Sequence, residues 1–146
     1  MTSVIFMYQE GASYSSGREF ICRKLIDTAS TVLSLPDEVQ VEFCNLGKSV
    51  YGSTSLEYRF RNRIGMNSEL LLQEIPAVLV HELIHLHQTY TGILRSNRHG
   101  QYFWNNRQIH VPKDISYEEY QRLPWEVDVQ ERHHKILTEI LTKALG

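Results

Sequence analysis

The sequence predicts an α+β fold in which a small mixed sheet packs against three helices. Residues 39–43 alternate apolar and polar side chains, the period of two expected of a half-buried strand. Residues 18–35 and 78–88 instead place apolar side chains at helical spacing. With 146 residues, the chain is long enough to form one domain, residues 1–146, with a core of its own.

The first part of the chain predicts two strands with a helix between them. Residues 4–8 form a short β-rich run, and residues 39–43 provide the second strand. The four residues from Ser16 match a capping box, in which a serine and a glutamate pair with the free amides of a helix start. We therefore expect a helix from Arg18 to about Leu35.

Residues 47–67 begin with turn-forming residues and then alternate loosely, which predicts one or two strands. The second of these is expected at the edge of the sheet, where Arg59, Arg61 and Arg63 would hinder pairing with other chains. An extended peptide could then lie antiparallel along this strand, around residues 61–66.

The second half of the chain predicts a hairpin and two helices. Pro76 suits the first turn of a helix, because the N–H that proline lacks would have no partner there. Asn105 and Asn106 tolerate positive φ angles, so residues 102–111 predict a hairpin that turns at this pair. The last helix is expected to begin near Pro124.

The composition argues against several classes of protein. Hydrophobic residues make up 42% and charged residues 22% of the chain, as in folded globular proteins. The formal net charge of −2 gives no electrostatic footprint for nucleic acid. We expect no signal peptide, because the short apolar run at residues 4–8 has no basic flank. We expect no membrane span either, because Pro76, Glu82 and several histidines interrupt the longest apolar segment. Cys22 and Cys44 have no metal-site spacing and suit a reducing compartment, so a cytoplasmic location is expected.

One motif carries most of the functional information. His81, Glu82 and His85 form the pattern H-E-x-x-H inside an apolar helical segment. Residues four apart lie one above the other on a helix, so both imidazoles can reach a single ion. Zinc binds imidazole nitrogen, and a catalytic zinc site usually has three protein ligands and a water. Glu82 would then take a proton from the water as it attacks a carbonyl.

The alternative is a buried helix whose histidines satisfy one another without a metal. A sequence of this composition contains the motif by chance about three times in a hundred. The apolar surroundings favour the metal site, because two imidazoles and a carboxylate are costly to bury without a partner.

Two residues are candidates for the third metal ligand. Glu126 lies near the start of the last helix, and a carboxylate there could complete a His-His-Glu site. Gln130, one turn later, would be placed to orient a ligand. The second candidate is His99, fourteen residues after His85.

The motif helix resembles that of the zincin metallopeptidases. In addition, the segment PWEVDVQ, residues 124–130, is similar to P-[YW]-E-x-[ED]-A in small gluzincin-type metallopeptidases, mostly from phages and bacteria. Val129 departs from this pattern, which usually has alanine, and Gln130 stands where larger gluzincins often have aspartate.

The gluzincin resemblance implies a set of roles for this chain. His81, His85 and Glu126 would hold zinc, and Glu82 would be the general base. An antiparallel edge strand would lie beside the motif helix. If the chain is encoded by a phage, its location would be the host cytoplasm.

His99 carries a rival resemblance, to the SprT-like zincins. In that family a third histidine follows in an H-[GS]-x-x-F segment, and residues 99–103 read HGQYF. The family segment continues as a helix, whereas the asparagines and the proline that follow here disfavour a helix.

The sequence leaves three hypotheses for function. The first is a zinc-dependent metallopeptidase acting on peptide or protein substrates, with Tyr117 and Tyr120 as candidate donors to the oxyanion. The second is a zinc-stabilised interaction domain of the same fold without turnover. The third is a metal-free structural protein. The oligomeric state cannot be read from the sequence.

Overall fold

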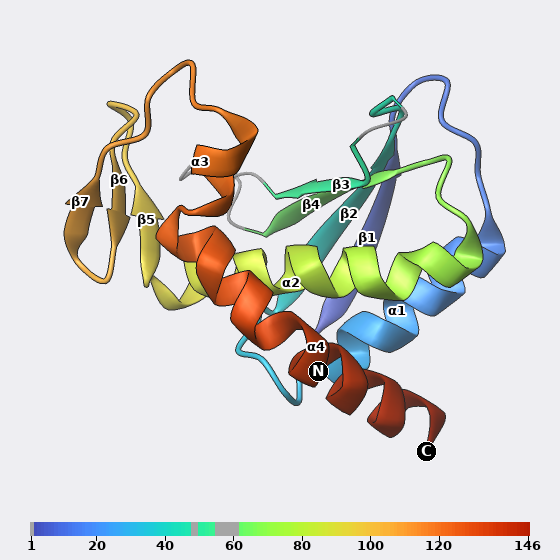
Figure 1. Ribbon diagram of the computed structural model, residues 1–146. Helices are drawn as coiled ribbons and strands as arrows, with labels where there is room; N and C mark the ends of the chain where they lie inside the picture. The colour runs from blue at the N-terminus through green and yellow to red at the C-terminus, as the bar shows by residue number, and fades with distance from the viewer. Residues whose placement is uncertain (1, 48–49, 55–61) are drawn as a thin grey trace.

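The computed structural model describes residues 2–47, 50–54 and 62–146, and it has the predicted α+β architecture (Figure 1). In chain order the elements are β1 (Ser3–Tyr8), α1 (Ser16–Ala29), β2 (Glu38–Cys44), β3 (Gly52–Thr54), β4 (Arg63–Asn67), the 3-10 turn η1 (Leu72–Glu74), α2 (Ile75–Thr91), β5 (Leu94–Ser96), β6 (Tyr102–Trp104), β7 (Arg107–Ile109), α3 (Tyr117–Gln121) and α4 (Pro124–Leu145).

The main sheet is mixed, with the strand order β1-β2-β4-β3. Strands β1, β2 and β4 are parallel, and β3 pairs antiparallel with β4. The predicted alternation of β2 is confirmed, because Val39, Val41 and Phe43 are buried. In the register with β4, Val41 lies opposite Ile64 and Phe43 opposite Met66, so apolar pairs stack across the core side of the sheet.

The edge strand beside α2 is β3, and the prediction that the arginine-bearing strand lies there is wrong. Strand β4, which carries Arg63, is paired on both sides, and its Ile64 and Met66 are completely buried. Strand β3 has only three residues, too few to show a period of two in the sequence. Arg59 and Arg61 lie outside the described residues.

Helix α1 begins with a different cap from the predicted one. Ser15 is the N-cap, and its Oγ accepts a hydrogen bond from the backbone N–H of Arg18 at 3.3 Å. Glu19 does not complete a capping box around Ser16, because its carboxylate accepts a hydrogen bond from the hydroxyl of Tyr8.

Helix α1 ends at Ala29 rather than near Leu35. The hydroxyls of Ser30 and Thr31 donate to the carbonyls of Asp27 and Thr28, and such local bonds compete with continuation of a helix. The apolar residues beyond Ala29 still pack on the core, which is why their spacing mimics a longer helix.

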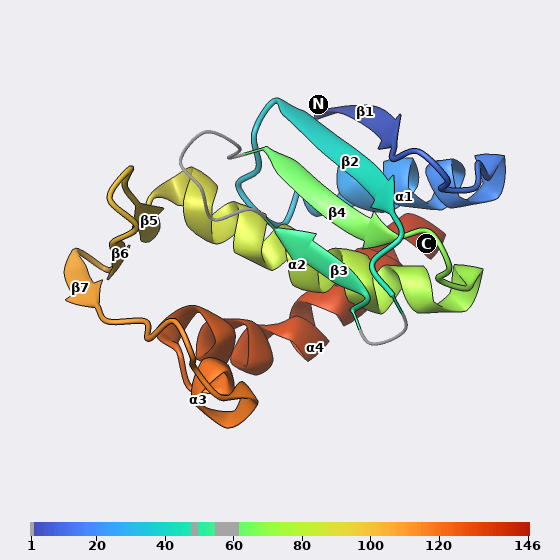
Figure 2. The ribbon, with the colours of Figure 1, turned by 90° about the horizontal axis from the view of Figure 1, so that it is seen from above.

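The three long helices form two layers over the main sheet. Helices α1 and α2 pack against one face of the sheet, and α4 crosses both of them on the side away from it (Figures 1 and 2). Buried Val129, Ile136 and Ile140 of α4 belong to the same core as the sheet and α2. No helix in the described part of the chain is long and apolar enough to cross a membrane.

A second, three-stranded sheet lies at the far end of α2. Gly92, with φ of 82°, ends α2 in a left-handed conformation that suits glycine, and β5 follows. The predicted hairpin is confirmed as β6 and β7, which turn at Asn105 and Asn106 with positive φ. This sheet packs around Trp125 and so holds the first turn of α4.

Candidate metal centre

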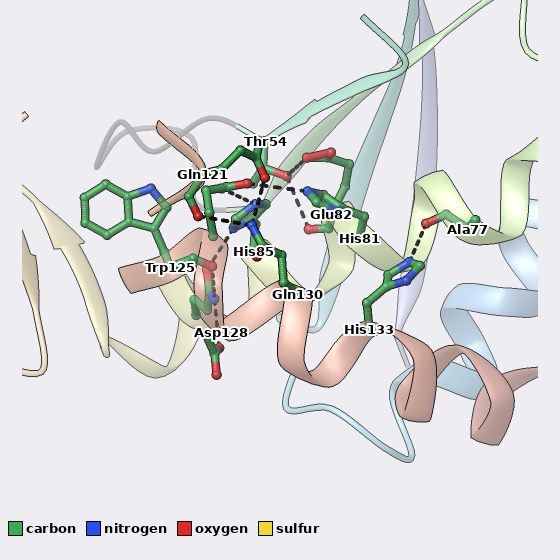
Figure 3. Close-up of polar contacts among 12 residues, drawn as sticks. Thr54, Ala77, His81, Glu82, His85, Gln121, Trp125, Asp128, Gln130 and His133 are labelled. Carbon is green, nitrogen blue, oxygen red and sulfur yellow. Dashed lines mark hydrogen bonds and ion pairs between the residues drawn. The ribbon is translucent and has the colours of Figure 1, made fainter. Parts of the chain in front are cut away.

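Helix α2 places Glu82 and His85 in the interior of the protein and His81 at its surface. His81 and His85 lie one turn apart, with ring centroids separated by 5.1 Å and rings inclined by 72° (Figure 3). The apolar residues around them are completely buried and hold the helix in the core: Leu79, Val80, Leu83, Ile84 and Leu86. His85 is itself buried, whereas the side chain of His81 is 40% exposed and reaches the surface of a cleft.

Glu126, in the first turn of α4, brings a carboxylate to this histidine pair. Its Oε2 lies 2.8 Å from Nε2 of His85, and its Oε1 lies 3.8 Å from Nε2 of His81. One potential ligand atom from each of the three residues lies within 4.8 Å of the other two. Two imidazoles and a carboxylate are a donor set that zinc takes in proteins.

The environment of Glu126 fits a bound cation. The residue is only 3% exposed, and its Oε2 accepts no well-aligned hydrogen bond from the described residues. A buried carboxylate is costly unless a partner compensates for it, and the imidazole of His85, 2.8 Å away, does so only when it is protonated. A cation held jointly with the two imidazoles would supply that compensation.

Local structure at the start of α4 determines where Glu126 lies. Pro124 occupies the first turn, where its missing N–H does no harm. Trp125 is buried in the second core, and its ring lies 5.7 Å from that of Tyr102. The buried indole therefore fixes the rotation of the first turn, which directs the next side chain towards α2.

The structure does not bring His99 to the histidine pair. This residue is exposed in the turn between β5 and β6, where its backbone N–H donates to the side chain of Asn97. His87 also lies apart from the pair, and its Nδ1 donates to the carbonyl of Ser34. Among the described residues, Glu126 alone joins His81 and His85.

Glu82 lies beside the pair and contacts the edge strand. Its Oε1 lies 2.7 Å from the hydroxyl of Thr54 in β3, which donates to it. A Cβ on Gly52 would come within about 3 Å of the Glu82 and Val78 side chains, so a larger residue there would require these side chains to shift. Burial raises the pKa of Glu82, although the nearby His85 and the bond from Thr54 oppose the shift.

The imidazoles have pKa values shifted in opposite directions. Burial, and then the charge of His85, lower the pKa of His81. Burial also disfavours the charged form of His85, but the adjacent carboxylate of Glu126 outweighs it and the pKa of His85 is raised. The charged form is therefore favoured at His85, which lies closer to the carboxylate, and disfavoured at His81.

A cleft of about 600 Å³ opens in front of these residues, between β3 and the first turns of α4. Tyr120 lines it, and burial together with the charges of Glu126 and Glu82 raises the pKa of Tyr120 to about 12. Its hydroxyl therefore remains a hydrogen-bond donor at neutral pH. Tyr117 also lines the cleft but is 77% exposed.

Several residues around the site were not predicted from the sequence, and one prediction is wrong. Gln130 does not orient a ligand, because its amide donates to the carbonyl and side chain of Gln121. The amide beside the ligands is that of Gln88, which contacts Nδ1 of His85 at 2.8 Å. Gln88 lies one helical turn after His85, and this spacing could have drawn attention to it.

His133 lies in the wall of the cleft. Its Nε2 donates to the carbonyl of Ala77 at 2.9 Å, which joins α4 to α2 (Figure 3). Its ring centroid lies 6.0 Å from that of His81. Thr54 had no signal in the sequence, since its strand is too short for a pattern.

Comparison with protein-family models, with curated proteins and with solved structures finds no match to this chain. The interpretation of the site therefore depends on its geometry and on the resemblance of its motifs.

We expect Glu126→Ala to abolish stoichiometric zinc binding, because it removes one of three converging donors. The affinity should fall by more than about 100-fold, since losing even an outer partner of a ligand costs about 10–100-fold. Metal content by mass spectrometry and competition with a chelator would measure this. The matched control is His99→Ala, which should keep one equivalent of zinc; loss of zinc from this variant instead would contradict the assignment.

Proposed function

We propose that the protein is a zinc-dependent metallopeptidase of gluzincin type. The observation that carries this proposal is the convergence of His81, His85 and Glu126 from two helices at the floor of a cleft, with Glu82 beside them. The resemblance of the H-E-x-x-H helix and of the PWE segment to zincins also supports this proposal, and it does not depend on the distances between the potential ligand atoms.

His81, His85 and Glu126 would hold the ion through imidazole Nε2 atoms and the carboxylate. A zinc ion bound there would act as a Lewis acid and lower the pKa of a water. The contribution of the chain is to keep these donors rigid, because all three are carried by helices packed in the core.

Glu82 would act as the general base. Thr54 holds Oε1 of its carboxylate, which leaves the second oxygen to take a proton from the attacking water. Burial raises the pKa of this carboxyl, and a base works best when its pKa approaches the working pH. The proton would then pass from Glu82 to the leaving amine.

Tyr120 would donate a hydrogen bond to the oxyanion that develops on the carbonyl. Its hydroxyl stays protonated, since its pKa is raised to about 12, and it lines the same cleft as Glu82 and Glu126. Such donors act on charge that appears only in the transition state.

An extended peptide would lie along β3 rather than along residues 61–66, because β4 is already paired on both sides. Strand β3 borders the cleft and pairs only with β4 among the described residues. Backbone hydrogen bonds to this edge would place a carbonyl of the substrate near Glu82.

Glu82→Gln is expected to retain zinc and to lower peptidase activity by about 10²–10⁴-fold, the usual contribution of a general base. Cleavage of a peptide library by zinc-loaded protein would measure the effect. Glu131→Gln, an exposed change on α4, is the matched control and should leave cleavage unchanged. Full activity in Glu82→Gln would contradict the mechanism, and zinc binding by an inactive wild type would favour the interaction-domain hypothesis.

Tyr120→Phe is expected to lower kcat by about 10²–10³-fold with little change in KM, as for other oxyanion donors. Tyr117→Phe should have a minor effect, because this side chain is largely in solvent. Steady-state kinetics on a cleaved peptide would separate the two. Equal losses in both variants, or none in Tyr120→Phe, would exclude the assigned role.

A further inference from the structure

Gln88 occupies an unusual position between the two helices that carry the potential ligands. The residue is completely buried, and its side chain contacts three groups. Its Oε1 lies 2.8 Å from Nδ1 of His85, and its Nε2 lies 3.0 Å from the carbonyl of Trp125 and 2.9 Å from Oδ2 of Asp128. Asp128 also accepts a hydrogen bond from Arg132 at 2.8 Å.

The chemistry of these partners allows only one orientation of the amide. A backbone carbonyl and a carboxylate can only accept hydrogen bonds, so the two amide hydrogens of Gln88 must face Trp125 and Asp128. The amide oxygen then faces His85 and can only accept. The hydrogen bond at 2.8 Å therefore requires the proton of His85 to be on Nδ1.

In the neutral imidazole that metal binding requires, this tautomer leaves the lone pair of His85 on Nε2, the atom that lies 2.8 Å from the carboxylate of Glu126. The same amide also sets the distance between the helices. Its two acceptors, Trp125 and Asp128, flank Glu126 in the first turn of α4. The ion pair with Arg132 keeps the carboxylate of Asp128 in place as an acceptor.

We propose that Gln88 is a positioning residue for the metal centre. It holds His85 with the proton on Nδ1 and docks the first turn of α4, so that His85 and Glu126 reach the same ion. The proposal rests on the metal centre of the proposed function. It adds the residue that fixes the positions of α2 and α4 relative to each other. A buried neutral amide serves this role without placing another charge beside the site.

The direct test is Gln88→Met, which keeps the approximate size of the side chain and removes its donors and acceptor. We expect the affinities for zinc and for cobalt to fall by about 10–100-fold, the typical effect of losing the partner of a ligand. Competition with a chelator would measure this, and the visible spectrum of the cobalt-loaded protein should change. Asn67→Leu is the structural control, since Asn67 is also buried and donates to the backbone carbonyls of Gly47 and Val50, which lie outside α2 and α4.

The melting temperature of each metal-free variant separates positioning from general stability. Both variants should melt below the wild type, but only Gln88→Met should lose metal affinity. If Gln88→Met does not fold, Asp128→Ala tests the same contact, because it removes one acceptor of the amide; we expect a loss of up to about tenfold. Wild-type affinity in the folded Gln88 variant, or in Asp128→Ala where that variant replaces it, would overturn the proposal.

Nitrogen NMR of the zinc-loaded wild type provides a second readout. The imidazole of His85 should carry its proton on Nδ1 and should bind the metal through Nε2. A proton on Nε2 would overturn the proposal even if the metal is bound. A wild type that binds no zinc would instead overturn the proposed function, so the two failures are distinguishable.

Discussion

The approach of the Glu126 carboxylate to His85, across the contact between α2 and α4, is the interaction on which the site depends. Oε2 of Glu126 and Nε2 of His85 are 2.8 Å apart, and both residues are almost fully buried. Desolvation of a carboxylate and two imidazoles opposes folding unless a partner compensates for it. Apolar packing of both helices into one core offsets this desolvation cost. A cation bound by all three side chains would make the cluster stabilise the fold.

Two polar contacts, one on each side of this cluster, join α2 to α4. At one end the imidazole of His133 donates to the carbonyl of Ala77, and at the other the amide of Gln88 reaches the first turn of α4. The potential ligands lie between these two contacts. Strand β3 completes the enclosure by placing Thr54 against Glu82, so the general base would be held by the sheet and the ligands by the helices.

Much of this arrangement could be predicted from the sequence, because it follows from local patterns. The period of two in β2, the helical spacing around His81, and the proline at the start of α4 are all confirmed by the structure. The position of β4 and the end of α1 were not predictable in this way. Whether a strand is paired on one side or on both depends on partners that are distant in the sequence. Helix α1 ends at hydroxyl groups that bond to nearby carbonyls, and the spacing of apolar residues gives no information about such bonds. Spacing along the sequence also made Gln130 a plausible neighbour of the ligands. The amide that contacts His85 is instead that of Gln88 on α2, and Gln130 on α4 contacts Gln121.

The most direct test of a zinc site between α2 and α4 is anomalous diffraction at the zinc absorption edge, from crystals grown with one equivalent of zinc. The proposed zinc site should give a single strong peak bounded by Nε2 of His81, Nε2 of His85 and the carboxylate of Glu126, at about 2.0–2.2 Å from each. A peak at other residues, such as His99, or no peak between the two helices, would contradict it.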